Sequence, residues 1–222
     1  MTTDARAQLA ALAARGVEWP RLPGGAGDGA RSAAVLVLFG VLDGLPAGHA
    51  SRAVPGDLDV LLLARAASLA HHPGQVAFPG GRLEPDDAGP VGAALREAAE
   101  ETGLDPRGVE VLGTLGELHL AVSDHVVVPV LAWWTRPSPV TAVDHRESAT
   151  VFRAPVADLL DPANRRTAVV PGRPYSGPAF LVPDAAGHHL VWGFTAMILD
   201  RLFDELGWAE PWDHRRTVPA PV

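Results

Sequence analysis

Residues 80–104 read GGRLEPDDAGPVGAALREAAEETGL, and this stretch carries the strongest structural signal in the chain. Two glycines open it, an acidic turn follows at Glu84–Asp87, and a helix is predicted for Pro90–Thr102. Gly103 then stands where a left-handed residue commonly ends a helix. The segment is therefore expected to form a tight turn followed by one well-delimited helix.

Three glutamates fall on neighbouring positions of this predicted helix. Because each helical residue advances by about 100°, Glu97 and Glu101 lie near one stripe and Glu100 lies beside Glu97. Carboxylates this close repel each other unless a cation lies among them. Ligands that are all oxygen suit Mg²⁺ or Mn²⁺. The pattern indicates a divalent-metal site, with Arg96 placed to orient Glu100 from the i,i+4 position.

The alternative is a solvated helix face, since surface helices are rich in glutamate. The flanking residues argue against it. A Gly-Gly pair precedes the helix, so the backbone at Gly80 and Gly81 can approach the same metal or phosphate group, and Gly103 ends the helix cleanly.

The segment resembles the Nudix signature, G-x5-E-x7-R-E-U-x-E-E-x-G-U, where U is a bulky apolar residue. Its right half is matched by Arg96, Glu97, Glu100, Glu101, Gly103 and Leu104, with Ala98 small for the first U. Counted from Gly81, the first Glu of the signature falls on Asp87, and eight residues instead of seven separate Asp87 from Arg96. Asp87 is therefore not assigned a catalytic role.

The resemblance implies an α/β fold, a Nudix-type α/β/α sandwich with a mixed β-sheet. It also implies a catalytic set of Glu97, Glu101, Arg96 and Glu147, with Glu97, Glu100 and Glu101 as metal ligands. The Mg²⁺ or Mn²⁺ would neutralise a diphosphate and lower the pKa of an attacking water. Either Glu97 or Glu147 is a candidate for the base that takes the proton, and Glu147 reads equally well as a surface-loop acid.

The stretch Leu61–Gly81 resembles a motif of coenzyme A-type Nudix pyrophosphatases, roughly L-L-T-x-[TR]-[SA]-x3-R-x3-G-x3-F-P-G-G. It matches at Leu61, Leu62, Arg65, Ala66, Gly74 and Phe78-Pro79-Gly80-Gly81. It departs at Leu63, where the motif has Thr, and at Ala70, where the motif has Arg. Phe78 is expected to pack in the core beneath the catalytic turn.

The resemblance implies hydrolysis of coenzyme A or acyl-coenzyme A to 3′,5′-ADP and 4′-phosphopantetheine or its acyl form. The substrate-binding residues expected from it are Arg65, His72, Gln75, Gly80 and Gly81. Two alternatives stay open. One is hydrolysis of another nucleoside diphosphate derivative such as ADP-ribose or NADH, and the other is a non-catalytic ligand-binding module. The second predicts eroded metal carboxylates, whereas all three are present.

The composition limits the remaining classes of function. The net charge of −8 argues against a nucleic-acid partner, and an anionic small-molecule substrate would need a cation. Cysteine is absent, which excludes disulfides and thiolate metal sites. The histidines lack zinc-site spacing. With no leader-like segment and no apolar run of membrane-spanning length, a cytoplasmic protein without membrane contact is expected, and a homodimer is one option for its assembly.

Three segments are expected along the chain. They are an N-terminal helix and linker at 1–30, a single Nudix hydrolase domain at 31–212 and a flexible tail at 213–222. Inside the domain, apolar runs predict strands at Ala33–Leu42, Asp59–Ala64, Val109–Leu115, Leu118–Val122, Val126–Trp134 and Thr150–Arg153. Helical patterns are found at Ala5–Ala14, Asp158–Leu160 and Thr195–Leu206.

Overall fold

The computed structural model describes residues 4–20, 29–41, 46–66, 74–120, 124–144, 148–184 and 187–221. The helices are α1 (Ala5–Arg15), α2 (Gly89–Thr102), α3 (Val156–Leu160) and α4 (Gly193–Leu206), with a 3₁₀ turn, η1, at Pro106–Gly108. The strands are β1 (Arg31–Val41), β2 (Leu58–Arg65), β3 (Val76–Ala77), β4 (Gly80–Arg82), β5 (Val109–Thr114), β6 (Leu118–Leu120), β7 (His125–Trp134), β8 (Ser148–Pro155), β9 (Arg165–Val169), β10 (Ser176–Asp184), β11 (Gly187–Val191) and β12 (Thr217–Pro219).

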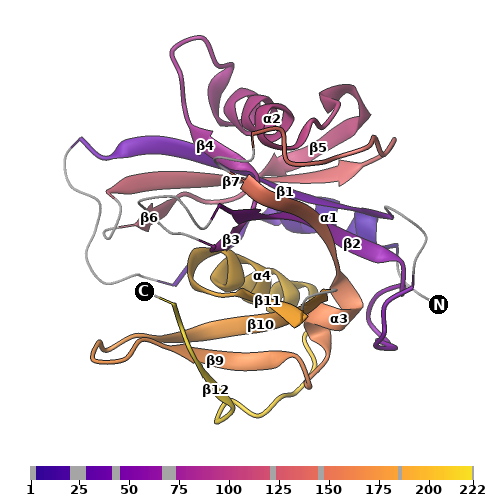
Figure 1. The fold of residues 1–222 in the computed structure, drawn as a ribbon. Helices are drawn as coiled ribbons and strands as arrows, with labels where there is room; N and C mark the ends of the chain where they lie inside the picture. The colour runs from indigo at the N-terminus through magenta and orange to yellow at the C-terminus, as the bar shows by residue number, and fades with distance from the viewer. Residues whose placement is uncertain are drawn as a thin grey trace.

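An eight-stranded sheet lies at the centre of the molecule (Figure 1). Its hydrogen-bonded order is β3-β2-β1-β7-β5. Three further strands pair with members of this row, β4 with β1, β6 with β7 and β8 with β2. β1 and β7 run parallel from Arg31 opposite His125 to Phe39 opposite Trp133, and the other pairs in this sheet are antiparallel. The sheet is therefore mixed, and the apolar runs of β1 and β2 are buried because helices cover both of its faces.

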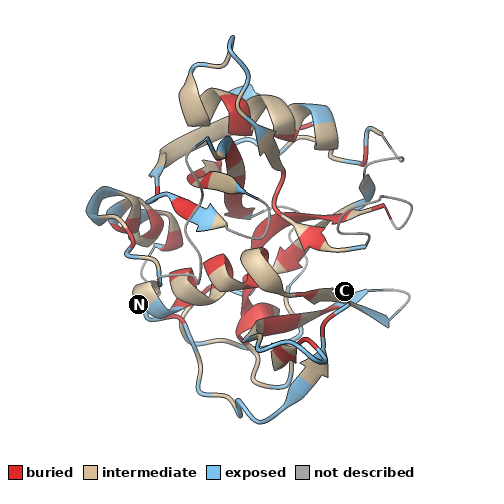
Figure 2. Cartoon of the chain, turned by 90° about the vertical axis from the view of Figure 1, so that its left-hand side faces the viewer, coloured by how far each residue is buried: buried red, intermediate tan, exposed pale blue. Residues whose placement is uncertain are grey.

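α2 covers one face of this sheet, and α1 and α4 lie on the other (Figure 1). The buried side of α2 consists of Ala93, Ala94, Ala98 and Thr102. These short side chains let the helix backbone approach the sheet closely. Buried residues are concentrated between the layers (Figure 2). The architecture is the α/β/α sandwich with a mixed sheet that the signature implies.

A second sheet adds a fourth layer on the far side of α4 (Figure 1). Its strands follow the order β11-β10-β9-β12, and Phe180, Val182 and Val191 pack with α4 in the larger core cluster. None of these strands is predicted from the sequence. The reason lies in β10, which carries Pro178 and Pro183 in the interior of a sheet, where proline normally argues against a strand.

The C-terminal tail corrects an expectation. The sequence predicts a flexible tail at 213–222, yet β12 pairs in parallel with β9 from Thr217 opposite Thr167 to Pro219 opposite Val169. Ala220 is buried, and its N–H donates to the carbonyl of Val169 at 2.9 Å. β12 has only three residues, of which Val218 is the one aliphatic side chain, so the segment has almost no periodic pattern. Only its pairing with β9 identifies it as a strand.

The other boundaries agree with the predictions to within a few residues. α2 begins at Gly89 and α4 at Gly193, one and two residues earlier than predicted. Both helices end at glycines in the left-handed conformation, Gly103 at φ 71° and Gly207 at φ 67°. None of the helices in the described ranges has the length and hydrophobicity that crossing a bilayer requires.

Candidate active site

The two consecutive glycines bring the backbone of β4 against the acidic helix. β4 pairs with β1, with Gly80 opposite Val35 and Gly81 opposite Ala34. A side chain at Gly80 would overlap the carbonyl oxygen of Ala34, and one at Gly81 would overlap the carboxylate of Glu97. A Cβ at Gly81 would therefore require the Glu97 carboxylate to move, whereas one at Gly80 would meet the backbone of β1.

Glu101 holds the same turn from one helical turn further along α2. Its carboxylate accepts a hydrogen bond from the backbone N–H of Gly80 at 3.0 Å. Glu97 and Glu101 thus both contact the Gly80–Gly81 backbone, as the i,i+4 spacing predicts. The Glu97 side chain is 19% exposed, and burial raises the pKa of its carboxyl group, an effect opposed by the hydrogen bond from Arg96.

Arg96 lies at the centre of the acidic groups of this region. Its guanidinium lies 3.1 Å from the carboxylate of Glu97 and 3.2 Å from that of Glu100. It also donates two hydrogen bonds to Asp87, at 2.9 and 3.0 Å, and one to the backbone carbonyl of Arg82 at 3.0 Å. The predicted contact between Arg96 and Glu100 is present, and Arg96 in addition ties α2 to the turn before it.

Asp87, to which the sequence assigns no catalytic role, has a structural one. Its side chain is only 7% exposed and accepts, besides the two bonds from Arg96, the backbone N–H of Glu84 at 2.8 Å. These hydrogen bonds hold the pKa of the Asp87 carboxyl below its ordinary value. The only signal in the sequence was an acid at the signature position, and the extra residue before Arg96 obscured it.

Glu100 is placed differently from the other two glutamates. Its side chain is 60% exposed and lies against Arg96 instead of the Gly80–Gly81 turn. Among the residues that the structure describes, no three His, Asp or Glu side chains are gathered closely enough to enclose a metal ion. The tight part of the site is therefore a pair of carboxylates, Glu97 and Glu101, on the glycine turn.

The donor set at this turn fits a hard divalent cation. Glu97 and Glu101 supply carboxylate oxygens beside the half-buried backbone of Gly80 and Gly81, and cysteine, which softer metals favour, is absent from the chain. An oxygen-only site with two acidic groups matches the preference of Mg²⁺ or Mn²⁺.

The substrate-binding candidates lie at both ends of one segment. Arg65 ends β2, and its backbone N–H donates to the carbonyl of Gln75 at 3.0 Å. β3 pairs with β2 just beyond, and the hydroxyl of Thr195 at the start of α4 donates to the carbonyl of Val76 at 3.0 Å. The chain then runs through Phe78, which is buried in the core as expected, to Gly80. His72 and Glu147 lie outside the described residues.

The Arg65 side chain enters this region in a partly buried state. Its Nε atom is buried and has no hydrogen-bond partner among the described residues. A buried guanidinium N–H without an acceptor is costly, so an acceptor such as a phosphate oxygen would stabilise it.

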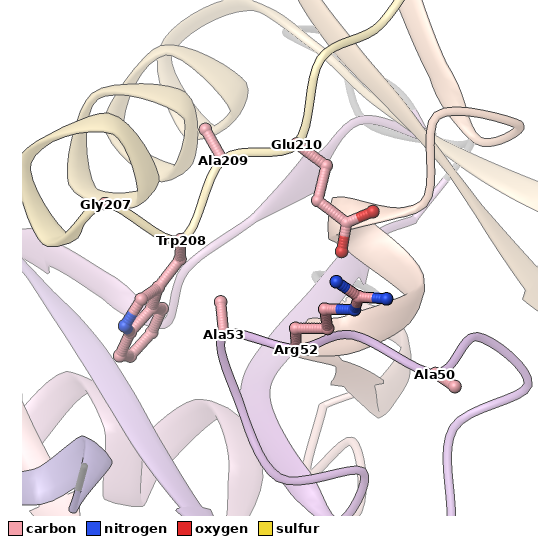
Figure 3. A pocket seen from close by; sticks show the side chains of 7 residues that line it. All are labelled: Ala50, Arg52, Ala53, Gly207, Trp208, Ala209 and Glu210. Carbon is pink, nitrogen blue, oxygen red and sulfur yellow. The ribbon is translucent and has the colours of Figure 1, made fainter. Parts of the chain in front are cut away.

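A separate hollow of about 320 Å³ lies between the loop after β1 and the segment after α4 (Figure 3). Arg52 and Glu210 face each other across it, and Glu210 also accepts from the ring of His49 at 3.1 Å. The remaining lining residues are Ala50, Ala53, Gly207, Trp208 and Ala209. The hollow includes none of the acidic side chains of α2, so it is not the centre that the glycine turn forms.

Comparison with known proteins gives one consistent result. A family model described as the NUDIX domain matches residues 50–170. Proteins of Salmonella paratyphi B and Salmonella newport, each named "Uncharacterized Nudix hydrolase NudL", are 38% identical over 148 residues, which is 67% of this chain and 75% of theirs. The crystal structure of RenU, a Nudix hydrolase from M. smegmatis, aligns with a TM-score of 0.51 at 19% identity and covers 83% of this chain and 90% of that one.

Proposed function

Because the chain belongs to the Nudix hydrolase family, whose members use divalent cations on nucleoside diphosphate derivatives, we propose that its own substrate is coenzyme A or acyl-coenzyme A. The reaction would cleave the diphosphate linkage and give 3′,5′-ADP and 4′-phosphopantetheine or its acyl form. The observation that carries this proposal is the continuity of Leu61–Gly81, whose coenzyme A-type motif leads directly into the glycine turn beneath Glu97 and Glu101.

The proposed roles follow the contacts of each residue. Glu97 and Glu101 would hold Mg²⁺ or Mn²⁺ at the Gly80–Gly81 turn, with Glu100 as a third carboxylate. The metal, when bound, would neutralise the diphosphate and acidify the attacking water. Arg96 positions Glu97 and Glu100 from the side. Either Glu97 or Glu147 would accept the proton of the water.

Arg65 is the proposed contact for a substrate phosphate. Its Nε atom has no hydrogen-bond partner among the described residues, and an arginine makes charge-assisted, often bidentate bonds to phosphate. Gln75 is proposed to bind a polar part of the same substrate, and its backbone bond to Arg65 places the two residues side by side. His72 is proposed for the same groove on the basis of the motif.

The test compares turnover of coenzyme A, an acyl-coenzyme A, ADP-ribose and NADH with Mg²⁺ or Mn²⁺. Coenzyme A or its thioester is expected to have the highest kcat/KM. Comparable or faster hydrolysis of ADP-ribose or NADH would favour the alternative substrate class. Binding without turnover of any of them, with either metal, would identify a ligand-binding module.

A further inference from the structure

Three basic side chains share one face of the central sheet at the end where β4 finishes and where β1 and β7 begin. Arg31 on β1 lies opposite His125 on β7, and Ala33, two residues further along β1, lies opposite Arg82 on β4. Because residues two apart on a strand and residues directly opposite on paired strands point to the same face, Arg31, Arg82 and His125 project together. Arg31 and Arg82 are diagonal neighbours, about 7–8 Å apart at their backbones.

The face on which they project is the one away from α2. Ala34, the neighbour of Ala33, packs with α2 in the smaller core cluster, so Ala33 and its partners point to the other side. Arg31 and Arg82 are both exposed, and His125 is half-buried. No other described residue forms an ion pair with the guanidinium of Arg82, whereas Arg96 on the α2 side is surrounded by carboxylates.

This basic patch, defined as Arg31, Arg82 and His125, borders the glycine turn directly. Arg82 follows Gly81, whose backbone contacts Glu97. Two acidic residues limit the patch, since Glu84 follows Arg82 by two positions and Asp124 directly precedes His125. The patch is nevertheless a local concentration of positive charge on a chain of net charge −8. Such a concentration beside a site for an anionic substrate attracts and orients an anionic group.

We propose that the basic patch binds a phosphate monoester that the substrate carries in addition to its diphosphate. If the substrate is coenzyme A, as proposed above, this group is the 3′-phosphate of its adenosine. The guanidinium of Arg82 is the main contact, and Arg31 supplies the second positive charge. The patch would supply positive charge that the motif lacks at Ala70, where coenzyme A-type sequences have arginine.

The inference rests on the proposed function and is tested by paired substrates that differ in one phosphate. Coenzyme A and 3′-dephospho-coenzyme A are compared by kcat/KM with the same divalent metal. The wild-type chain is expected to prefer coenzyme A by about 10- to 100-fold, which is the range that a charge-assisted contact provides. Higher ionic strength is expected to reduce the preference, since exposed charges are screened.

Arg82→Gln is the decisive variant. It is expected to raise KM for coenzyme A about tenfold or more and to leave kinetics on the dephosphorylated substrate within about twofold. Arg31→Gln is expected to act in the same direction with a smaller effect. Arg107→Gln is the matched control, because Arg107 is 85% exposed and lies on η1. This substitution should leave the kinetics on both substrates unchanged. Thermal unfolding of each variant separates a folding defect from a lost contact.

A binding measurement separates the hypothesis of the basic patch from the proposed hydrolysis of coenzyme A. Calorimetry compares 3′,5′-ADP with 5′-AMP for the wild-type chain and Arg82→Gln. Tighter binding of 3′,5′-ADP that the substitution abolishes supports the patch, whichever substrate is turned over, and equal binding of both nucleotides overturns it. Hydrolysis of coenzyme A and its dephospho form at equal kcat/KM also overturns the patch and leaves the proposed function standing. Failure to hydrolyse coenzyme A, with turnover of ADP-ribose, removes the proposed function.

Discussion

The guanidinium of Arg96 lies within 4.0 Å of four carboxylates, those of Glu84, Asp87, Glu97 and Glu100, and is itself 24% exposed. One cation therefore balances much of the charge that the acidic helix accumulates. Asp87 fixes one edge of the guanidinium and Glu97 lies at another, so the position of the Glu97 carboxylate depends on a residue ten positions earlier in the chain.

Asp87→Asn is expected to lower kcat with little change in KM, because it releases Arg96 and, through it, Glu97, without touching the substrate. Asp87→Glu should recover part of the activity, since it restores the charge. Steady-state kinetics on the best substrate measures both. Equal kcat for the wild type and Asp87→Asn would show that Arg96 is held well enough by its other partners.

The ion pair between Asp87 and Arg96 predicts how the free energy of unfolding changes with pH. The pKa of Asp87 is lowered in the folded chain by its bonds from Arg96 and Glu84, so the unfolded chain binds the proton more readily. The stabilisation is therefore fully present above the ordinary aspartate pKa of about 3.9 and is lost as pH falls through the lowered folded value. Urea unfolding between pH 7 and pH 3 should show a wild-type advantage over Asp87→Asn that is constant down to about pH 5 and then shrinks. An advantage that grows towards low pH would contradict the assignment.

Glu101→Gln separates metal binding from folding at the same site. Glutamine retains an oxygen that can accept the Gly80 N–H, so the turn should persist and thermal stability should change little. The loss of a carboxylate ligand is expected to lower kcat by roughly 10²- to 10⁴-fold and to raise the Mg²⁺ or Mn²⁺ concentration needed for half-maximal rate. Glu100→Gln should have a smaller effect because Glu100 is 60% exposed. Unchanged activity of Glu101→Gln would remove the proposed metal role.

At the scale of elements, the sequence predicts the helices and strands that have a clear pattern of apolar residues within their own length. The runs in β1, β2 and β7 and the helical spacing in α2 and α4 are strong enough to place each element within a few residues. The second sheet could not be predicted in this way, because the interior position of Pro178 in β10 is decided by its partners β9 and β11. In the site, helical spacing predicts the Arg96–Glu100 contact, whereas the Asp87–Arg96 contact depends on the conformation of the turn between them.

Gly81→Ala tests the contact between two elements, β4 and α2. The added Cβ would overlap the Glu97 carboxylate and displace it, so activity is expected to fall by about 10²-fold or more, as for a misplaced catalytic group. Gly56→Ala is the matched control, since a Cβ at Gly56 meets open space. Kinetics and thermal unfolding of both variants measure the effect. Full activity of Gly81→Ala would show that Glu97 need not lie against the turn.

At the scale of the whole molecule, the acidic helix and the second sheet lie on opposite sides of the central sheet (Figure 1). The proposed metal site therefore lies in the α2 layer, and the β9–β12 sheet packs against the side of α4 that faces away from the central sheet. Arg165 of β9 shows how closely that outer layer is packed. It is buried between the rings of Phe180 and Trp212, 4.2 and 4.7 Å from their centroids, and it forms an ion pair with Asp200 of α4.

Deletion of residues 213–222 distinguishes an integrated strand from a loose tail. The deletion removes β12 with the bonds from the Thr167 N–H to Arg216, from the Thr167 hydroxyl to His214 and from the Ala220 N–H to Val169. Each of these three bonds contributes about 0.5–1.5 kcal/mol net, so the free energy of unfolding, measured by urea denaturation, should fall by roughly 1.5–4.5 kcal/mol. Because α2 and the glycine turn lie in a different layer, kcat of the folded fraction should stay within about twofold of the full chain. Unchanged stability would mean that β12 adds nothing to the second sheet, and a loss of kcat in the folded protein would mean that the outer layer reaches the metal site.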